Sequence, residues 1–156
     1  MVSIRRFTAA VRPLACMTVF AFGPAMAHMQ AATSCRPAQT AVKGLQYSGG
    51  AITALRAPTE VVCPVDRLSD IPAGGSFVTW VYAEAGAGTI SCNLESYDFF
   101  GKFLGEQGFQ LTGSISYQLV LTAGQAPPRS AQVLHCVMGQ GTHLWNYESF
   151  ERANGE

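Results

Sequence analysis

The sequence predicts an all-β domain, an antiparallel β-sandwich of Ig-like or jelly-roll-like type that is held by disulfides. Three observations lead to this prediction: an N-terminal export signal, four cysteines that remain after its removal, and short runs of alternating apolar and polar residues. Six or more such runs follow one another from Val61 onward at a spacing of about 8–15 residues, without a long helical pattern. This organisation is typical of sandwiches and barrels.

Residues 1–27 have the organisation of a cleaved secretory signal peptide. Three arginines form a basic front, residues 14–22 are largely apolar, and Ala25-Met26-Ala27 supplies the small residues that signal peptidase needs. The apolar run is well short of the roughly 20 residues that span a bilayer. We therefore expect a periplasmic or extracellular protein, a single domain over residues 28–156, and no transmembrane anchor in the mature chain.

Charge and motifs argue against several classes of function. Removal of 27 of the 156 residues leaves 129, and the loss of three arginines leaves 7 Lys+Arg against 10 Asp+Glu. This acidic balance argues against nucleic acid, whose affinity comes mainly from cations that neutralise phosphates. The chain has no G-x-S-x-G elbow, no H-E-x-x-H helix and no phosphate-binding Gly loop. We expect a non-catalytic binding or structural protein that needs no cofactor.

The cysteines of the mature chain predict two disulfides. Cys16 leaves with the signal, and four cysteines remain: Cys35, Cys63, Cys92 and Cys136. Four cysteines in a small exported domain are typical of a disulfide framework with three possible connectivities. A zinc site usually needs a close C-x-x-C pair, whereas the nearest spacing here is 28 residues.

The strand faces favour one pairing of these cysteines. Cys92 and Cys136 each share a strand face with apolar residues, so both are expected to point inward. We expect a Cys92–Cys136 bridge through the core of the sandwich. Cys35 and Cys63 then tie the N-terminal segment to an early strand. Each bridge is worth about 2–4 kcal/mol.

The predicted strands follow from period-two alternation and from the turn residues that bound them. Residues 97–109 contain three glycines, which discourage a helix and favour extended or hairpin structure. Gly139-Gln140-Gly141 is expected to form the hairpin between the last two strands. The expected strands are 60–65, 76–84, 88–96, 114–122, 130–138 and 142–150, with weaker candidates at 45–48 and 51–55.

Four stretches of the chain resemble a loose group of small exported bacterial proteins. The stretches are "VVCPV" (61–65), "ISCNLESYDFFG" (90–101), "LHCVMG" (134–139) and "LWNYESFE" (144–151). The resemblance covers most of the mature chain and rests on the positions of the cysteines and on the residue pattern of the strands. It implies an exported all-β domain with two disulfides, and it transfers no catalytic residues.

The histidines raise two hypotheses. His135 beside Cys136 suggests a thiolate–imidazole pair, but adjacent strand residues point to opposite faces and the thiol is expected to be oxidised. Cleavage after Ala27 would make His28 the N-terminal residue, and a second histidine, His135 or His143, would complete a copper site. That arrangement resembles the histidine brace of lytic polysaccharide monooxygenases and of some periplasmic copper carriers. A copper-binding or copper-oxidase module is therefore the alternative function.

Two aromatic pairs offer a binding hypothesis. Trp80 and Tyr82, and Trp145 and Tyr147, have i, i+2 spacing on predicted strands, so each pair is expected to share a face. A pair that faces solvent is a stacking platform for a sugar ring or an anchor for a protein partner. A pair that faces inward belongs to the core, and we expect this of at least one pair. The expected partner is thus a protein or a glycan.

Overall fold

The computed structural model describes residues 28–38, 44–67 and 75–153. Within these ranges the regular structure consists of eleven strands and one turn of 3-10 helix, η1 (Ala32–Ser34). The strands are β1 (His28–Ala31), β2 (Arg36–Pro37), β3 (Leu45–Ser48), β4 (Ala51–Ala54), β5 (Thr59–Val65), β6 (Ser76–Glu84), β7 (Ile90–Tyr97), β8 (Phe103–Leu111), β9 (Ser114–Thr122), β10 (Ala131–Met138) and β11 (His143–Arg152). The predicted signal peptide, residues 1–27, lies outside the described residues.

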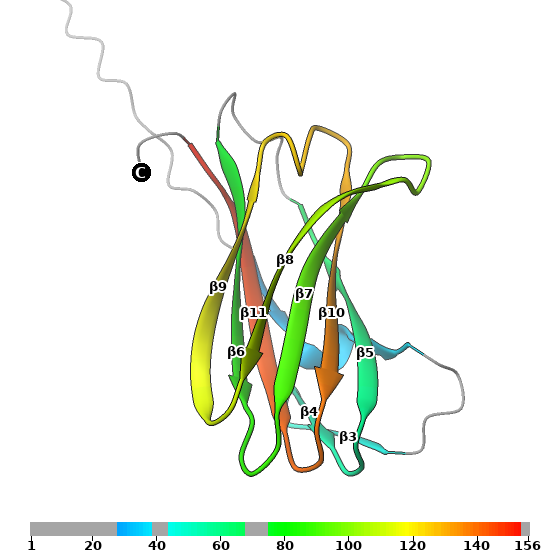
Figure 1. The fold of residues 1–156 in the computed structure, drawn as a ribbon, viewed down its shortest axis with the longest axis vertical. Helices are drawn as coiled ribbons and strands as arrows, with labels where there is room; N and C mark the ends of the chain where they lie inside the picture. Colours follow the sequence, from blue (N-terminus) through cyan, green and yellow to red (C-terminus); the bar gives the residue numbers. More distant parts are fainter. Residues whose placement is uncertain (1–27, 39–43, 68–74, 154–156) are drawn as a thin grey trace, which may run out of the picture.

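The strands form two antiparallel sheets that pack face to face (Figure 1). Sheet A has the order β3-β4-β11-β6-β9, with β1 also paired to β11. Sheet B has the order β2-β5-β10-β7-β8. The predicted antiparallel β-sandwich is therefore confirmed.

The core lies between the sheets because alternate side chains of each strand point inward. In β7, for example, every second residue from Ile90 to Ser96 is buried and the residues between them are partly exposed. The largest fully buried apolar side chains come from both layers: Ile52, Phe77, Leu119, Leu121, Leu144 and Tyr147 from sheet A, and Ile90, Leu94, Leu134 and Met138 from sheet B. The period-two pattern in the sequence thus indicates which face of each strand packs against the other sheet.

Consecutive strands mostly change sheets, as in jelly-roll-like sandwiches. Only β3–β4 and β7–β8 are adjacent in both chain order and space among the described strands. The second of these confirms the prediction of extended or hairpin structure over residues 97–109. The hairpin predicted at Gly139-Gln140-Gly141 is wrong, because β10 belongs to sheet B and β11 to sheet A. Strand β10 already has β5 and β7 as neighbours, so the chain must cross to the other layer.

Both disulfides join neighbouring strands or segments of sheet B. Cys35 is bonded to Cys63, and Cys92 is bonded to Cys136, which is the favoured connectivity. All four side chains are fully buried. The Cys92–Cys136 bond lies in the core as predicted, but it stays within sheet B: the two residues are direct cross-strand partners, with Cα atoms 4.1 Å apart. Facing sheets lie about 10 Å apart, beyond the usual Cα separation of a disulfide.

Tyr147 connects the N-terminal segment to both layers. Its side chain on β11 is fully buried. The hydroxyl donates to the carbonyl oxygen of Pro64 on β5 and lies 2.8 Å from Ser34 Oγ in η1. Burial raises the pKa of Tyr147, so the hydroxyl remains a protonated donor at neutral pH.

Replacement of Tyr147 by phenylalanine tests this connection. We expect Tyr147→Phe to lower the free energy of unfolding by about 1–3 kcal/mol, because the Pro64 carbonyl loses a buried donor while the ring still fills the core. Urea unfolding monitored by circular dichroism measures the change. Tyr47→Phe, which removes the hydroxyl of a 42% exposed tyrosine, is the matched control and should stay within about 0.5 kcal/mol. Equal effects of the two changes would contradict the assignment.

Candidate functional site

The outer face of sheet A, which points away from the core, carries Trp80 and Tyr82. Both side chains are partly exposed on β6, whereas Phe77 and Val81 of the same strand are buried. Trp80 lies opposite Gln118 of β9 and Glu148 of β11. Tyr82 lies opposite Ser116 and Asn146 of the same two strands. Cross-strand partners on one face lie about 5 Å apart at their Cβ atoms, so these side chains form one continuous surface.

The prediction that Trp145 and Tyr147 share a face is wrong. The pairing of β11 with β6 shifts between Leu144 and Asn146, which leaves Trp145 as the extra residue of a β-bulge. The bulge shifts the alternation by one residue, so Leu144 and Tyr147 are both fully buried. Trp145 is 47% exposed. Tyr147 is therefore a core residue, and Trp145 is available to solvent.

Trp145 joins Trp80 and Tyr82 on the outer face of sheet A. Its ring stacks on that of His143, with centroids 5.7 Å apart and planes inclined by 22°. His143 is opposite Glu84, which shares its strand face with Tyr82 and Trp80. The Nδ1 atom of His143 lies 2.8 Å from Thr53 Oγ1, so the imidazole that supports Trp145 is itself held.

Polar groups lie among these aromatic rings, and two of them are unsatisfied. The Nε2 atom of Gln118 and the Oδ1 atom of Asn146 are buried and have no hydrogen-bond partner. The Tyr82 hydroxyl donates to Glu148 at 3.4 Å. Burial, and then the Glu148 carboxylate, raise the pKa of Tyr82, so this phenol is a neutral donor at pH 7. We call Trp80, Tyr82, Gln118, Trp145, Asn146 and Glu148 the aromatic–amide face.

The three histidines are in separate places, so the structure gives no support to the alternative copper site. His28 pairs with Ser149 of β11, six residues from His143, and a rise of about 3.3 Å per residue places these positions about 20 Å apart. His135 points outward from sheet B, away from Cys136 as expected, and lies 3.6 Å from Glu95 and 3.8 Å from Glu60. In the described ranges, no three His, Cys, Asp or Glu side chains gather closely enough to hold a metal ion.

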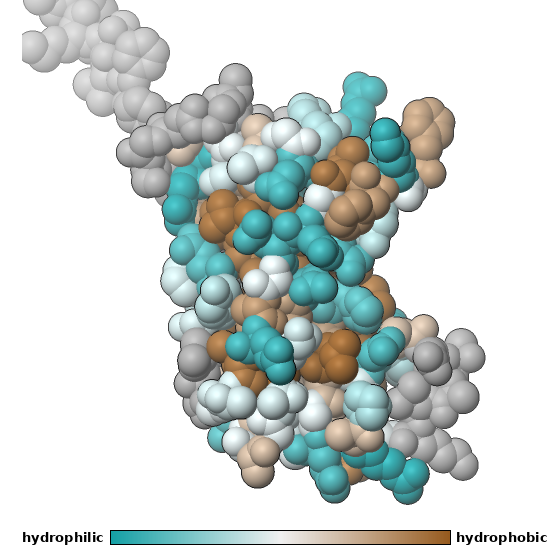
Figure 2. All heavy atoms as spheres, viewed as in Figure 1, coloured by the Kyte–Doolittle hydropathy of each residue, from teal (hydrophilic) through white to brown (hydrophobic). Residues whose placement is uncertain are grey.

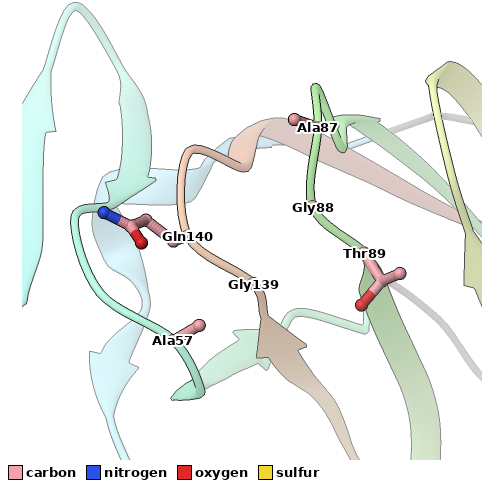
Figure 3. Close-up of a pocket in the computed structure, with 6 residues that line it drawn as sticks. All are labelled: Ala57, Ala87, Gly88, Thr89, Gly139 and Gln140. Carbon is pink, nitrogen blue, oxygen red and sulfur yellow. The ribbon is translucent and has the colours of Figure 1, made fainter.

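A hollow at one end of the sandwich is a weaker candidate site (Figure 3). Its volume is about 600 Å³, and it lies between the turns that follow β4, β6 and β10. The lining side chains are short apart from one glutamine, and none is charged or aromatic: Ala57, Ala87, Gly88, Thr89, Gly139 and Gln140. The hollow therefore offers few groups for specific recognition. The aromatic–amide face, which combines stacking surfaces with hydrogen-bonding groups, is the better candidate.

No protein-family model matches the chain, and no curated protein matches it significantly in sequence. Solved structures do resemble it in fold. The xylan-binding module CBM86 from Roseburia intestinalis has a TM-score of 0.52 and 14% identity, over 83% of this chain and 98% of that one. The xylan-binding module CBM15 has a TM-score of 0.50 and 14% identity, over 81% of this chain and 96% of that one.

A third similar structure belongs to a larger protein. An arabinose-bound α-L-arabinofuranosidase has a TM-score of 0.48 and 10% identity, and the match covers 77% of this chain but 23% of the enzyme. At these identities the comparisons establish the fold alone: a sandwich like those of carbohydrate-binding modules. In the part of the chain that the structure describes, no helix is long and apolar enough to cross a membrane.

Proposed function

We propose that this protein is an exported, non-catalytic glycan-binding module and that its ligand lies on the aromatic–amide face. One observation carries the proposal. Three partly or half-exposed aromatic side chains, Trp80, Tyr82 and Trp145, share a face with two amides that have unpaired polar atoms. Sheet A presents them as a surface rather than a closed pocket, which suits a chain-like ligand.

The chemistry of sugars fits both halves of this surface. Each sugar ring has an apolar face of C–H groups that packs against an aromatic ring, and a rim of hydroxyls that both donate and accept hydrogen bonds. Such hydroxyls would supply an acceptor for Gln118 Nε2 and a donor for Asn146 Oδ1 after rotation of the two side chains brings these buried atoms to the surface. The Glu148 carboxylate beside Trp80 disfavours an acidic polysaccharide through like-charge repulsion. We therefore infer a neutral glycan.

Export is supported by two independent features. Residues 1–27 have signal-peptide character, and two buried disulfides require an oxidising compartment for their formation. The same sandwich architecture occurs in modules named for xylan binding. These features support a binding protein of the periplasm or the medium.

Binding to neutral polysaccharides tests the proposed function. We expect affinity electrophoresis to show retardation of the purified protein in soluble xylan, mixed-linkage β-glucan or another neutral glycan. Trp80→Ala or Trp145→Ala should weaken the binding at least tenfold, or about 1.4 kcal/mol. Tyr47→Ala is the matched control. Tyr47 is also an exposed tyrosine of sheet A, but its cross-strand partner is the core residue Ile52, so it does not lie on the aromatic–amide face. No retardation in any neutral glycan, or equal retardation of all variants, would refute the proposal.

Gln118 provides a second test that separates binding from folding. Its unpaired, buried Nε2 atom destabilises the unliganded protein. We expect Gln118→Leu to leave the free energy of unfolding unchanged or to raise it, while it weakens glycan binding at least fivefold. Thermal unfolding and glycan titration of the same sample measure both effects. A variant that loses stability and retains affinity would show that the amide serves the fold.

A further inference from the structure

The turn between β7 and β8 presents the most exposed large apolar side chains among the described residues. Phe99 is 85% exposed and Phe100 is 89% exposed. In Figure 1 this hairpin extends beyond the neighbouring strands, and Figure 2 shows hydrophobic side chains at that end of the molecule. Two adjacent phenylalanines that are exposed to water lower the solubility of a protein. Neither the core nor the aromatic–amide face accounts for them.

The turn is held rigidly by its own hydrogen bonds. The Asp98 carboxylate accepts from the backbone N–H groups of Phe100 and Lys102 at 2.9 and 2.8 Å. The backbone N–H of Asp98 donates to the Lys102 carbonyl, and that of Gly101 donates to the Asp98 carbonyl. Gly101 has φ +79°, which a residue without a Cβ adopts at low cost. The two phenylalanines are therefore displayed in a fixed arrangement, which reduces the entropy lost on binding.

Aromatic side chains continue below the apex in a second tier. The rings of Phe99 and Phe100 meet edge to face at the apex, with centroids 5.5 Å apart. Tyr97 and Phe103 meet in the same manner where the strands begin, with centroids 5.8 Å apart. Lys102 is exposed between the two tiers. We call Tyr97, Phe99, Phe100, Lys102 and Phe103 the aromatic tip.

We propose that the aromatic tip inserts into the interfacial region of a phospholipid membrane. Fully apolar rings lie at the apex, amphipathic Tyr97 and cationic Lys102 lie nearer the body, and this order matches the polarity gradient from acyl chains to headgroups. Four hydrogen bonds pair backbone and side-chain groups of the turn with one another. This arrangement suits a medium that offers few hydrogen bonds.

The shape and charge of the tip favour lipid over a protein pocket. The tip is convex and projects from the body, so it can enter a fluid surface without a matching cavity (Figure 1). Glu95 and Glu106 lie directly opposite one another below the tip. These carboxylates oppose an anionic surface, so the attraction rests on the rings and not on lipid charge. The proposed ligand is therefore a zwitterionic lipid surface.

Vesicles of pure phosphatidylcholine test this proposal on the full mature protein. We expect sedimentation with the vesicles at millimolar lipid, with a partition constant no greater than the roughly 10⁴ M⁻¹ of a single myristoyl chain and little dependence on salt. The double change Phe99→Ser and Phe100→Ser should lower the partition constant at least tenfold. Leu55→Ser is the matched control, because Leu55 is 50% exposed on the β4–β5 turn and should leave partitioning unchanged.

Two further measurements make the result decisive. The tryptophan fluorescence of the Phe100→Trp variant should shift to the blue when vesicles are added. Lipids brominated on their acyl chains should quench this fluorescence. Unchanged glycan binding by the double serine variant would show that it is folded and that the tip acts separately from the aromatic–amide face. Vesicle binding that is absent, or equal in wild type and double variant, overturns the proposal. Self-association that disappears in the double variant, without vesicle binding, would assign the tip to a protein contact instead.

Discussion

Replacement of Cys92 and Cys136 by alanine is expected to lower the free energy of unfolding by about 4 kcal/mol. The bond closes a loop of 44 residues, and the entropy of such a loop in the unfolded chain corresponds to about 4.0 kcal/mol at 25 °C. Both side chains are fully buried in the core, so their loss also leaves a small cavity. Because a domain of this size is stable by about 5–15 kcal/mol, this change removes a large share of the total.

Guanidinium unfolding of the variant and the wild type measures this loss. The matched variant lacks Cys35 and Cys63, whose loop of 28 residues corresponds to about 3.6 kcal/mol. We expect its unfolding to begin in the N-terminal segment, which remains attached through the pairing of β1 with β11. A change below about 1 kcal/mol on removal of Cys92 and Cys136 would mean that the reduced chain is already constrained.

The strands were predictable because their signal is local. The alternation over residues 76–84 and 114–122 gave the bounds of β6 and β9 without error. Pairing between strands is decided by contacts far apart in the sequence, and there the predictions were weaker. The inward direction of Cys92 and Cys136 was correct, but nothing local shows that β7 and β10 are neighbours. The crossover after β10 was missed for the same reason.

The candidate site was predictable only in part. The shared face of Trp80 and Tyr82 follows from regular alternation in β6. Gln118 and Asn146 were missed, because a strand amide carries no sequence signal until its neighbours are known. The spacing of two residues in the sequence does indicate the bulge. Leu144 and Tyr147 of β11 are both buried and are three positions apart, and a regular strand does not place such residues on one face.

Two single-residue deletions in β11 should differ strongly in their effect on stability. Deletion of Trp145 removes the extra residue of the bulge, so Leu144, Asn146 and Tyr147 become consecutive and keep their directions. We expect this variant to fold, with a loss of about 1 kcal/mol or less in the free energy of unfolding, which is typical of a single change. The loss reflects the position of the bulge, where the neighbour of β11 changes from β4 to β1. Glycan binding should fall as in Trp145→Ala.

Deletion of Glu148, three residues along the same strand, leaves the bulge in place and reverses the alternation beyond it. Either the residues from Ser149 onward exchange faces, so that Ser149 turns outward and Phe150 turns inward, or the bulge closes and Tyr147 becomes exposed while Asn146 becomes buried. Loss of the buried Tyr147 ring costs about 3–5 kcal/mol, and burial of an unpaired amide adds about 1–3 kcal/mol. That sum approaches the stability of the whole domain, so we expect an unfolded or aggregated product by circular dichroism and size-exclusion chromatography. If the two deletions proved equally harmful, the fold itself would depend on the bulge; if only the Glu148 deletion unfolds the chain, the extra residue serves chiefly to place Trp145 on the aromatic–amide face.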